Sequence, residues 1–184
     1  KYYYFDYQKL SGFAGWLASQ DITLAGHDVK RDVYMLMCVG AVTDRVSYDT
    51  AIAQYVLDSG RSNYSLSALS NEYLYMSVEE EADFMASNGQ VDLFTDNTKL
   101  FMDYGFKVCF AVLNLKEIQK KLLVDEDLEK IFYEVELPLV KVMAAMEKEG
   151  FKVDKKELIS FGEMLSSEID DLTAKIYEAA GETF

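Results

Sequence analysis

The spacing of hydrophobic positions divides this chain into a mixed first third and a helical remainder. Short apolar or aromatic runs at residues 1–5, 22–25 and 45–48 predict β-strands. Between them, apolar residues recur every three or four positions, which predicts helices over residues 10–17, 33–39 and 51–57. This alternation of strand and helix predicts an α/β sandwich whose sheet is complete early in the chain.

Beyond residue 65 the apolar spacing is helical almost throughout. It predicts helices over residues 66–74, 100–123 and 128–146, with one more inside residues 71–103, and the helix 100–123 is apolar enough to lie buried. The only proline, Pro138, should bend its helix or mark a local start, because it lacks a backbone N–H donor. Asp154 and Glu157 form a capping box that opens a long amphipathic helix. Its apolar seam needs a partner and consists of Leu158, Phe161, Leu165, Ile169, Leu172 and Ile176.

The charge of the chain disfavours independent binding to nucleic acid. The formal net charge is −14, whereas phosphate contacts require lysine and arginine to displace counterions. Half of this charge lies in an acidic insert at residues 71–103, which we interpret as a solvated variable insertion in preference to an acidic docking patch. Lys116, Lys120 and Lys121 form a small basic edge that we interpret as a solvated helix face.

The cysteines and apolar runs indicate a cytoplasmic protein without a membrane span. Cys38 and Cys109 stand apart in apolar helical surroundings, which predicts reduced core cysteines. The longest apolar run, residues 108–112, is far below the roughly 18 residues that a span requires. No secretory leader is visible, and because the chain opens with strand-like residues we expect it to be cut from a longer protein.

Several kinds of site are excluded or disfavoured by the residues present. His27 is the only histidine, so zinc sites rich in histidine and Ser-His-Asp or Cys-His catalysis within this chain are excluded. The glycines make neither a dinucleotide nor a P-loop fingerprint. Aromatic residues are abundant near the start, and core packing explains them better than base stacking because basic residues do not interleave: Tyr2, Tyr3, Tyr4, Tyr7 and Trp16.

Ordered motifs along nearly the whole chain resemble the proofreading region of family A DNA polymerases, the family of bacterial DNA polymerase I. They lie at residues 26–32 (GHDVKRD), 48–57 (YDTAIAQYVL), 65–69 (SLSAL), 136–140 (ELPLV), 150–154 (GFKVD) and 176–184 (IYEAAGETF). The resemblance implies a ribonuclease-H-like exonuclease fold, incomplete at its N-terminus, over residues 1–125. Residues 126–184 would then be a helical connection to the polymerase thumb and its beginning.

The same resemblance assigns four acids to a pair of divalent ions that cleave DNA in the 3′-to-5′ direction. Asp32 matches one of them, with Lys30 two residues before it, while Asp28 stands where the family usually has asparagine. Tyr104 matches the tyrosine that orients the attacking water, but Val108 replaces the acid four residues later. The Asp-x-Glu pair of the first strand is absent, since 127–129 (DLE) falls in a helical, surface-like stretch.

We therefore expect a vestigial exonuclease domain that serves as a scaffold, without a catalytic residue, metal ion or cofactor of its own. The resemblance implies that the parent protein is a DNA-directed DNA polymerase of replication and repair, which uses Mg²⁺ and dNTPs. This piece would meet DNA only through that parent, contact the remainder of the polymerase chain and avoid membranes. Two alternatives stay open: an active metal-dependent exonuclease whose first motif lies upstream, and an acidic protein-interaction module.

Overall fold

The computed structural model describes residues 10–41, 44–88 and 98–183, and these residues form two compact units, Lys1–Glu149 and Gly150–Phe184. The strand predicted at residues 1–5 lies outside the described residues. The proposed division into an exonuclease region, 1–125, and a thumb connection, 126–184, stays a prediction, since it concerns family correspondence and not compactness. Each unit is described by itself below.

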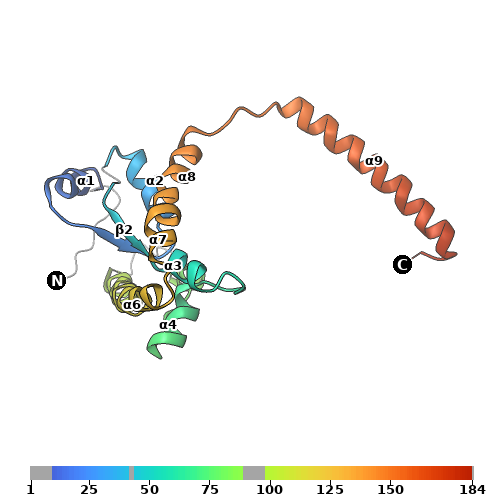
Figure 1. The fold of residues 1–184 in the computed structure, drawn as a ribbon. Helices are drawn as coiled ribbons and strands as arrows, with labels where there is room; N and C mark the ends of the chain where they lie inside the picture. The colour runs from blue at the N-terminus through green and yellow to red at the C-terminus, as the bar shows by residue number, and fades with distance from the viewer. Residues whose placement is uncertain (1–9, 42–43, 89–97, 184) are drawn as a thin grey trace. The chain divides into compact units, whose positions relative to one another are not determined.

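A two-stranded parallel sheet is the only sheet in the described part of the chain, as Figure 1 shows for the first unit. Strand β1 (Leu24–Gly26) pairs with β2 (Val46–Asp49), so that Gly26 lies opposite Asp49. Helix α1 (Leu10–Ser19) precedes β1, and α2 (Lys30–Cys38) connects the two strands. The α/β prediction is therefore confirmed, with each strand displaced by one or two residues from its predicted position.

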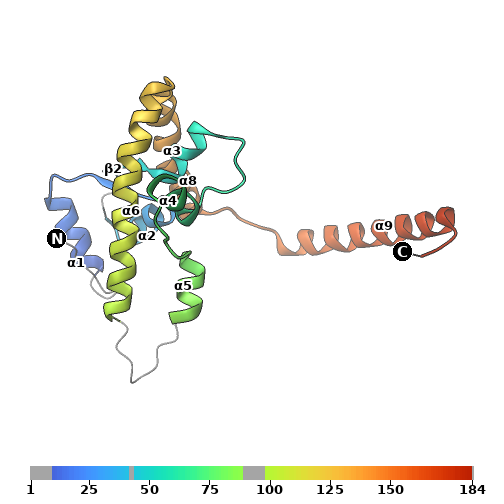
Figure 2. The ribbon, with the colours of Figure 1, turned by 90° about the horizontal axis from the view of Figure 1, so that it is seen from below.

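Helices cover both sides of this sheet. After β2 come α3 (Thr50–Leu57), α4 (Leu66–Leu74), α5 (Glu81–Asn88) and the long α6 (Thr98–Asp125). Helix α8 (Leu137–Glu149) packs against α2 on one side of the strands, while α6 packs against α3 and α4 on the other (Figures 1 and 2). No helix in the described ranges has the length and apolar character needed to cross a membrane.

The core of the first unit consists of two clusters that meet at the sheet. One cluster surrounds Tyr48 and Phe132, whose ring centroids are 4.9 Å apart, and includes Ala53, Leu123 and Leu137. The other joins α2 to α8 through Val33 and Ala144. Burial of such side chains stabilises the fold by about 1.5 to 3 kcal/mol each.

The helix predicted over residues 128–146 is interrupted by a wider turn. A short α7 (Glu129–Ile131) continues into a π-helix (Phe132–Glu136) and then into α8, where Pro138 is the second residue. Pro138 donates no N–H, and its ring would clash with the carbonyl of Glu134 in a regular helix, which the π-helical turn avoids. The prediction that Pro138 marks a local start is confirmed.

Two predictions about burial are wrong. Helix α6 buries only one side, because α3, α4 and β1 contact only that side, and Phe106, Phe110 and Leu113 remain exposed. Trp16 on α1 was expected in the core, but 46% of its surface is exposed and its ring stacks on Phe13. Apolar composition alone does not reveal which side of a helix meets a neighbour.

The second unit is a single helix, α9 (Lys155–Ala180). Asp154 caps it by accepting hydrogen bonds from the backbone N–H groups of Lys156 and Glu157, as the sequence predicted. Gly181 ends the helix with a φ of 78°. None of its residues is buried, so the apolar seam is exposed along its whole length.

Candidate functional site

The candidate site lies where the two parallel strands end. The carboxyl ends of parallel strands lie at the same edge of a sheet, where α/β proteins commonly bind ligands. Here β1 ends at Gly26 and leads through His27 and Asp28 into α2, whereas β2 ends at Asp49 and leads directly into α3. The two turns that follow the strands therefore lie beside each other.

A single buried carboxylate joins these two turns. Asp49 is 1% exposed, and its Oδ1 accepts hydrogen bonds from the N–H groups of Asp28, Ala51 and Ile52 at 3.1, 2.8 and 3.2 Å. Its Oδ2 accepts from the N–H of Val29 at 2.8 Å. Burial raises the pKa of Asp49, and the four N–H donors oppose that rise by favouring the charged form. Asp49 thus caps α3 and fixes the start of α2 with the same side chain.

His27 makes a second link between the turns. Its Nδ1 lies 2.9 Å from Oγ1 of Thr50, and that hydroxyl donates to the carbonyl of Gly26 at 3.2 Å. Because the hydroxyl proton is used in this way, Nδ1 of His27 must carry a hydrogen and donate it to Thr50. Burial lowers the pKa of His27, despite the opposing effect of the Asp49 and Asp28 carboxylates.

The conformation of the β1–α2 turn explains two of its residues. A Cβ atom on Gly26 would lie 2.4 Å from Cγ1 of the buried Val29, so only glycine fits there. Asp28 has a φ of 49°, a left-handed conformation that aspartate and asparagine tolerate better than other side chains. The turn thereby brings Asp32 into the first turn of α2.

All three residues singled out by the sequence line one cavity. Asp32, Tyr104 and Val108 belong to the wall of a cavity of about 830 Å³ that also includes His27 and Lys116. Val108 presents methyl groups where an oxygen ligand would be needed. Among the described residues, no group of three or more histidine, cysteine, aspartate or glutamate side chains is arranged to hold a metal ion. Five carboxylates line the cavity, but in the described part of the chain they are not gathered as a pair of divalent cations requires, since each cation needs several oxygen ligands around it.

The surroundings of Asp32 and Tyr104 favour their neutral forms. Asp32 is exposed as a residue, yet the protein packed around its carboxyl group raises its pKa, and Glu81 adds to the rise while Arg31 opposes it. Burial also raises the pKa of Tyr104, reinforced by the neighbouring glutamates at residues 79–81. The hydroxyl of Tyr104 donates a hydrogen bond to the backbone carbonyl of Glu79 at 3.4 Å. Tyr104 is thus engaged within the protein.

Comparison with known families identifies the first half of this chain. Residues 2–86 match the family described as DNA polymerase I, ribonuclease H-like domain. The DNA polymerase I of Bacillus subtilis is 28% identical over 94% of the chain, and that of Caldicellulosiruptor bescii is 34% identical over 74%. The chain belongs to the DNA polymerase I family. It spans 19% of the length of the Bacillus subtilis protein and 14% of the length of the other.

A solved structure supports the same fold for this chain. The POL domain of Pol1 from M. smegmatis, solved with a DNA primer-template and dNTP, superposes with a TM-score of 0.70. The superposition covers 97% of this chain and 28% of that one, at 22% sequence identity. The ribonuclease-H-like exonuclease fold expected from the sequence is confirmed.

Several residues in and near the cavity lie in surroundings that differ from the expected ones. Lys116 was expected on a solvated helix face, but it lines the cavity with its Nζ atom 5.8 Å from the Tyr48 ring centroid. Cys38 and Cys109 were expected in the core, and both are exposed free thiols, with Cys109 in the cavity wall.

Part of the acidic insert lines the cavity, so the insert is not the fully solvated segment that the sequence suggested. The glutamates at residues 79–81 line it, while Val78 and Phe84 are buried with exposed fractions of 2% and 3%. The signal in the sequence was the pair of apolar residues six positions apart among the acids. The net charge of the segment is a poor guide to its position, because one buried aromatic side chain contributes more to fixing a segment than several exposed charges do.

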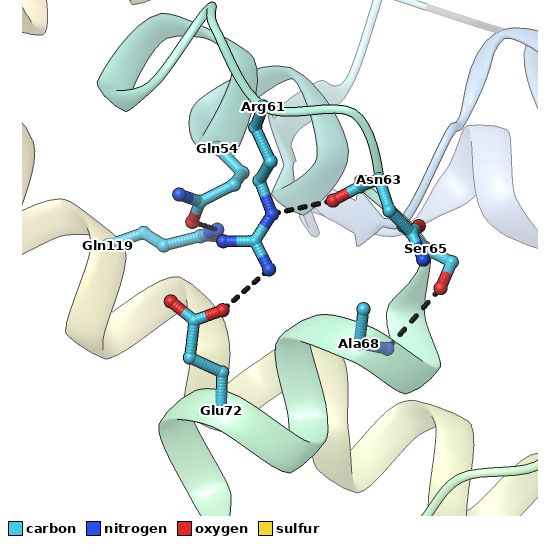
Figure 3. A network of polar contacts seen from close by, with 7 residues as sticks. All are labelled: Gln54, Arg61, Asn63, Ser65, Ala68, Glu72 and Gln119. Carbon is cyan, nitrogen blue, oxygen red and sulfur yellow. Dashed lines mark hydrogen bonds and ion pairs between the residues drawn. The ribbon is translucent and has the colours of Figure 1, made fainter.

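A polar network holds the cavity wall formed by the start of α4. Arg61 donates to the carbonyl of Asn63 and to Glu72 on α4, both at 2.5 Å, as Figure 3 shows. Ser65, which lines the cavity, caps α4 by accepting from the N–H of Ala68. Deeper in the protein, Gln119 of α6 donates to Gln54 of α3 and to the carbonyl of Thr50. These contacts tie α3, α4 and α6 into one frame.

Proposed function

We propose that this chain is a non-hydrolytic, exonuclease-like part of a DNA polymerase I that supports the polymerase as a scaffold. The observation that supports the proposal is the cavity wall, where Val108 stands in place of an acid near Asp32 and, among the described residues, no three acidic, histidine or cysteine side chains are arranged to hold a metal ion. Without paired divalent ions, neither the attacking water nor the leaving oxygen of a phosphodiester would be stabilised.

The activity of the whole protein is part of the same proposal. The related proteins from Bacillus subtilis and Caldicellulosiruptor bescii are named DNA polymerase I, and the chain spans only a small share of each. We propose that the parent synthesises DNA from dNTPs with Mg²⁺ in replication and repair, in the cytoplasm. It would hold the primer-template chiefly outside this chain, whose net charge of −14 disfavours phosphate contacts.

The scaffold role is supported by the packing of the first unit. Phe132 and Leu137 lie in the same cluster as Tyr48 at the end of β2, so the segment that follows α6 is built into the exonuclease-like core. Removing that core would expose the apolar side chains of residues 132–144 that now contact it. Retention of the domain therefore needs no catalytic explanation.

The proposal is tested by digestion of single-stranded DNA with the parent polymerase. We expect no 3′-to-5′ degradation with Mg²⁺ or Mn²⁺, and no change on Asp32→Ala, while primer extension by the same preparation shows that the enzyme is folded. Asp21→Ala, at an exposed acid outside the cavity wall, is the matched control. Degradation that Asp32→Ala abolishes and Asp21→Ala preserves would establish the active exonuclease instead.

A further inference from the structure

Part of the chain between α4 and α6 lines the cavity. We define residues 76–87, which include most of α5, as the acidic strap. Three consecutive glutamates of the strap, Glu79, Glu80 and Glu81, line the cavity together with Asp32 and Tyr104. Figure 2 shows α5 beside the N-terminal half of α6, the helix that carries Tyr104.

An aromatic contact anchors the strap to α6. The ring of Phe84 stacks on Tyr104 with centroids 4.0 Å apart and planes 9° from parallel, and it meets the edge of Phe101 at 5.2 Å. Phe84 is 3% exposed, so the strap covers one side of the Tyr104 ring. The Tyr104 hydroxyl is used by the strap as well, through its hydrogen bond to the carbonyl of Glu79. The strap thus engages the hydroxyl group and one face of the Tyr104 ring.

An ion pair fastens the strap to the opposite wall. Nη2 of Arg31 on α2 lies 3.0 and 2.7 Å from the two carboxylate oxygens of Glu81. The pair joins residues fifty positions apart, and both side chains are largely exposed, at 67% and 55%. Exposed ion pairs are weak and screened by salt, so this contact can open without unfolding the domain.

The strap also sets the sign of the charge around the cavity. With the strap in place, its three glutamates and the acids Asp28 and Asp32 outnumber the cations Arg31 and Lys116. Without the three glutamates, two acids face two cations, and Arg31 loses its carboxylate partner. A phosphodiester chain is therefore repelled in the closed arrangement and is no longer repelled in the open one.

We propose that the acidic strap is a lid that closes the cavity against polyanions, with Phe84 as its anchor and the Arg31–Glu81 ion pair as its latch. The lid acts through charge and coverage and requires no hydrolysis, so it stands or falls separately from the proposed loss of exonuclease activity.

Hydrogen–deuterium exchange of the full chain tests the latch. We expect Glu81→Gln and Arg31→Met each to speed amide exchange within residues 77–87 by about two- to fivefold. This factor corresponds to losing the stabilising free energy of one exposed ion pair. About 0.5 M sodium chloride should produce the same change in the unmodified protein by screening. Unchanged exchange in both variants, or equal acceleration in α3 and α8, would overturn the latch.

A second ion pair supplies the matched control for the latch. Lys30 and Glu147 are joined by a contact of 2.5 Å that lies outside the strap and outside the cavity wall. We expect Glu147→Gln to leave exchange within residues 77–87 unchanged, although it removes the same charge. Acceleration of the strap as large as that caused by Glu81→Gln would show a general effect of charge and refute the assignment.

Binding of an oligodeoxythymidylate probe tests the exclusion of polyanions. Neutralising the lid with Glu79→Gln, Glu80→Gln and Glu81→Gln should raise the affinity for the probe at low salt by about tenfold. The control removes three charges from exposed positions on α9 with Glu163→Gln, Glu168→Gln and Asp170→Asn. Equal affinity in both triple variants would overturn the lid, because net charge alone would then explain the result.

Discussion

Asp49 shows how one side chain can fix the geometry of a cavity without lining it. Each of its oxygens accepts backbone N–H groups, and together they join the start of α2 to the start of α3. Unpaired N–H groups in such a place cost free energy because water cannot reach them. The position of Asp32 in the cavity wall therefore depends on Asp49.

We expect Asp49→Ala to lower the free energy of unfolding by about 2 to 4 kcal/mol, combining the loss of a helix cap with buried donors left unsatisfied. Urea denaturation followed by circular dichroism measures the change. Asp58→Ala, at the exposed C-terminal end of α3, is the matched control and should cost less than about 1 kcal/mol. Similar costs for the two variants would contradict the role assigned to Asp49.

His27 should make stability depend on pH in a defined direction. Its pKa in the folded protein is lowered below 6.5 by burial, so the unfolded chain binds the proton more readily. The contribution of neutral His27 is then fully present above pH 6.5 and decreases as the pH falls toward the folded pKa. Asp32 and Asp49, whose pKa values are raised, act in the opposite direction at lower pH.

The pH effect of His27 is isolated by a difference measurement. We expect the stability advantage of the unmodified protein over His27→Gln to shrink between pH 7.5 and 5.5, as followed by urea denaturation at each pH. Glutamine does not titrate in this range, so the acids contribute equally to both proteins. A difference that stays constant or grows as the pH falls would show that His27 is not buried in its neutral form.

At the scale of elements, helix boundaries followed from the sequence more readily than helix surroundings. The cap at Asp154 depends on local conformation, which the sequence carries directly. The exposure of Phe106 and Phe110 depends on which neighbours reach α6, which is a tertiary property. The π-helical turn before Pro138 likewise had no local signal beyond the proline itself.

The π-helical turn should be anchored chiefly by Phe132. Its ring is fully buried against Tyr48, so we expect Phe132→Ala to lower the free energy of unfolding by about 3 to 5 kcal/mol. Tyr133, the next residue, is 36% exposed, and Tyr133→Ala should cost about 1 kcal/mol or less. Thermal and urea denaturation of the two variants check the difference, and a larger loss for Tyr133→Ala would contradict this packing.

At the scale of the whole molecule, the acidic charge should dominate encounters with DNA. We expect the isolated chain to leave the fluorescence anisotropy of a labelled single-stranded oligonucleotide unchanged up to about 50 µM protein at 0.15 M salt. The variant in which the three glutamates of the strap are changed to glutamine, described above, provides the comparison. A dissociation constant near 1 µM with a steep salt dependence would contradict the expectation.

The sequence led to the right family and to three residues of one cavity. The motifs follow one another in the order typical of the family, even though the residue at a metal-ligand position such as Val108 differs. Asp32, Tyr104 and Val108 do share a wall, although more than seventy positions separate the first from the others. Asp49, Lys116 and Glu81 were not recognised as parts of that site. Their roles depend on long-range contacts, and a carboxylate that binds backbone N–H groups has the same one-letter code as one that faces solvent.

The carboxylate of Asp49 fixes the two turns but is not among the side chains that line the cavity, and this separation matters for protein engineering. Asp49 holds the two turns together through hydrogen bonds to backbone N–H groups, whereas Val108 and Cys109 lie in the cavity wall. Substitutions at residues 108 and 109 can therefore change the cavity wall and leave the hydrogen bonds of Asp49 in place. The domain is consequently a suitable starting point for designing a binding site for a small molecule.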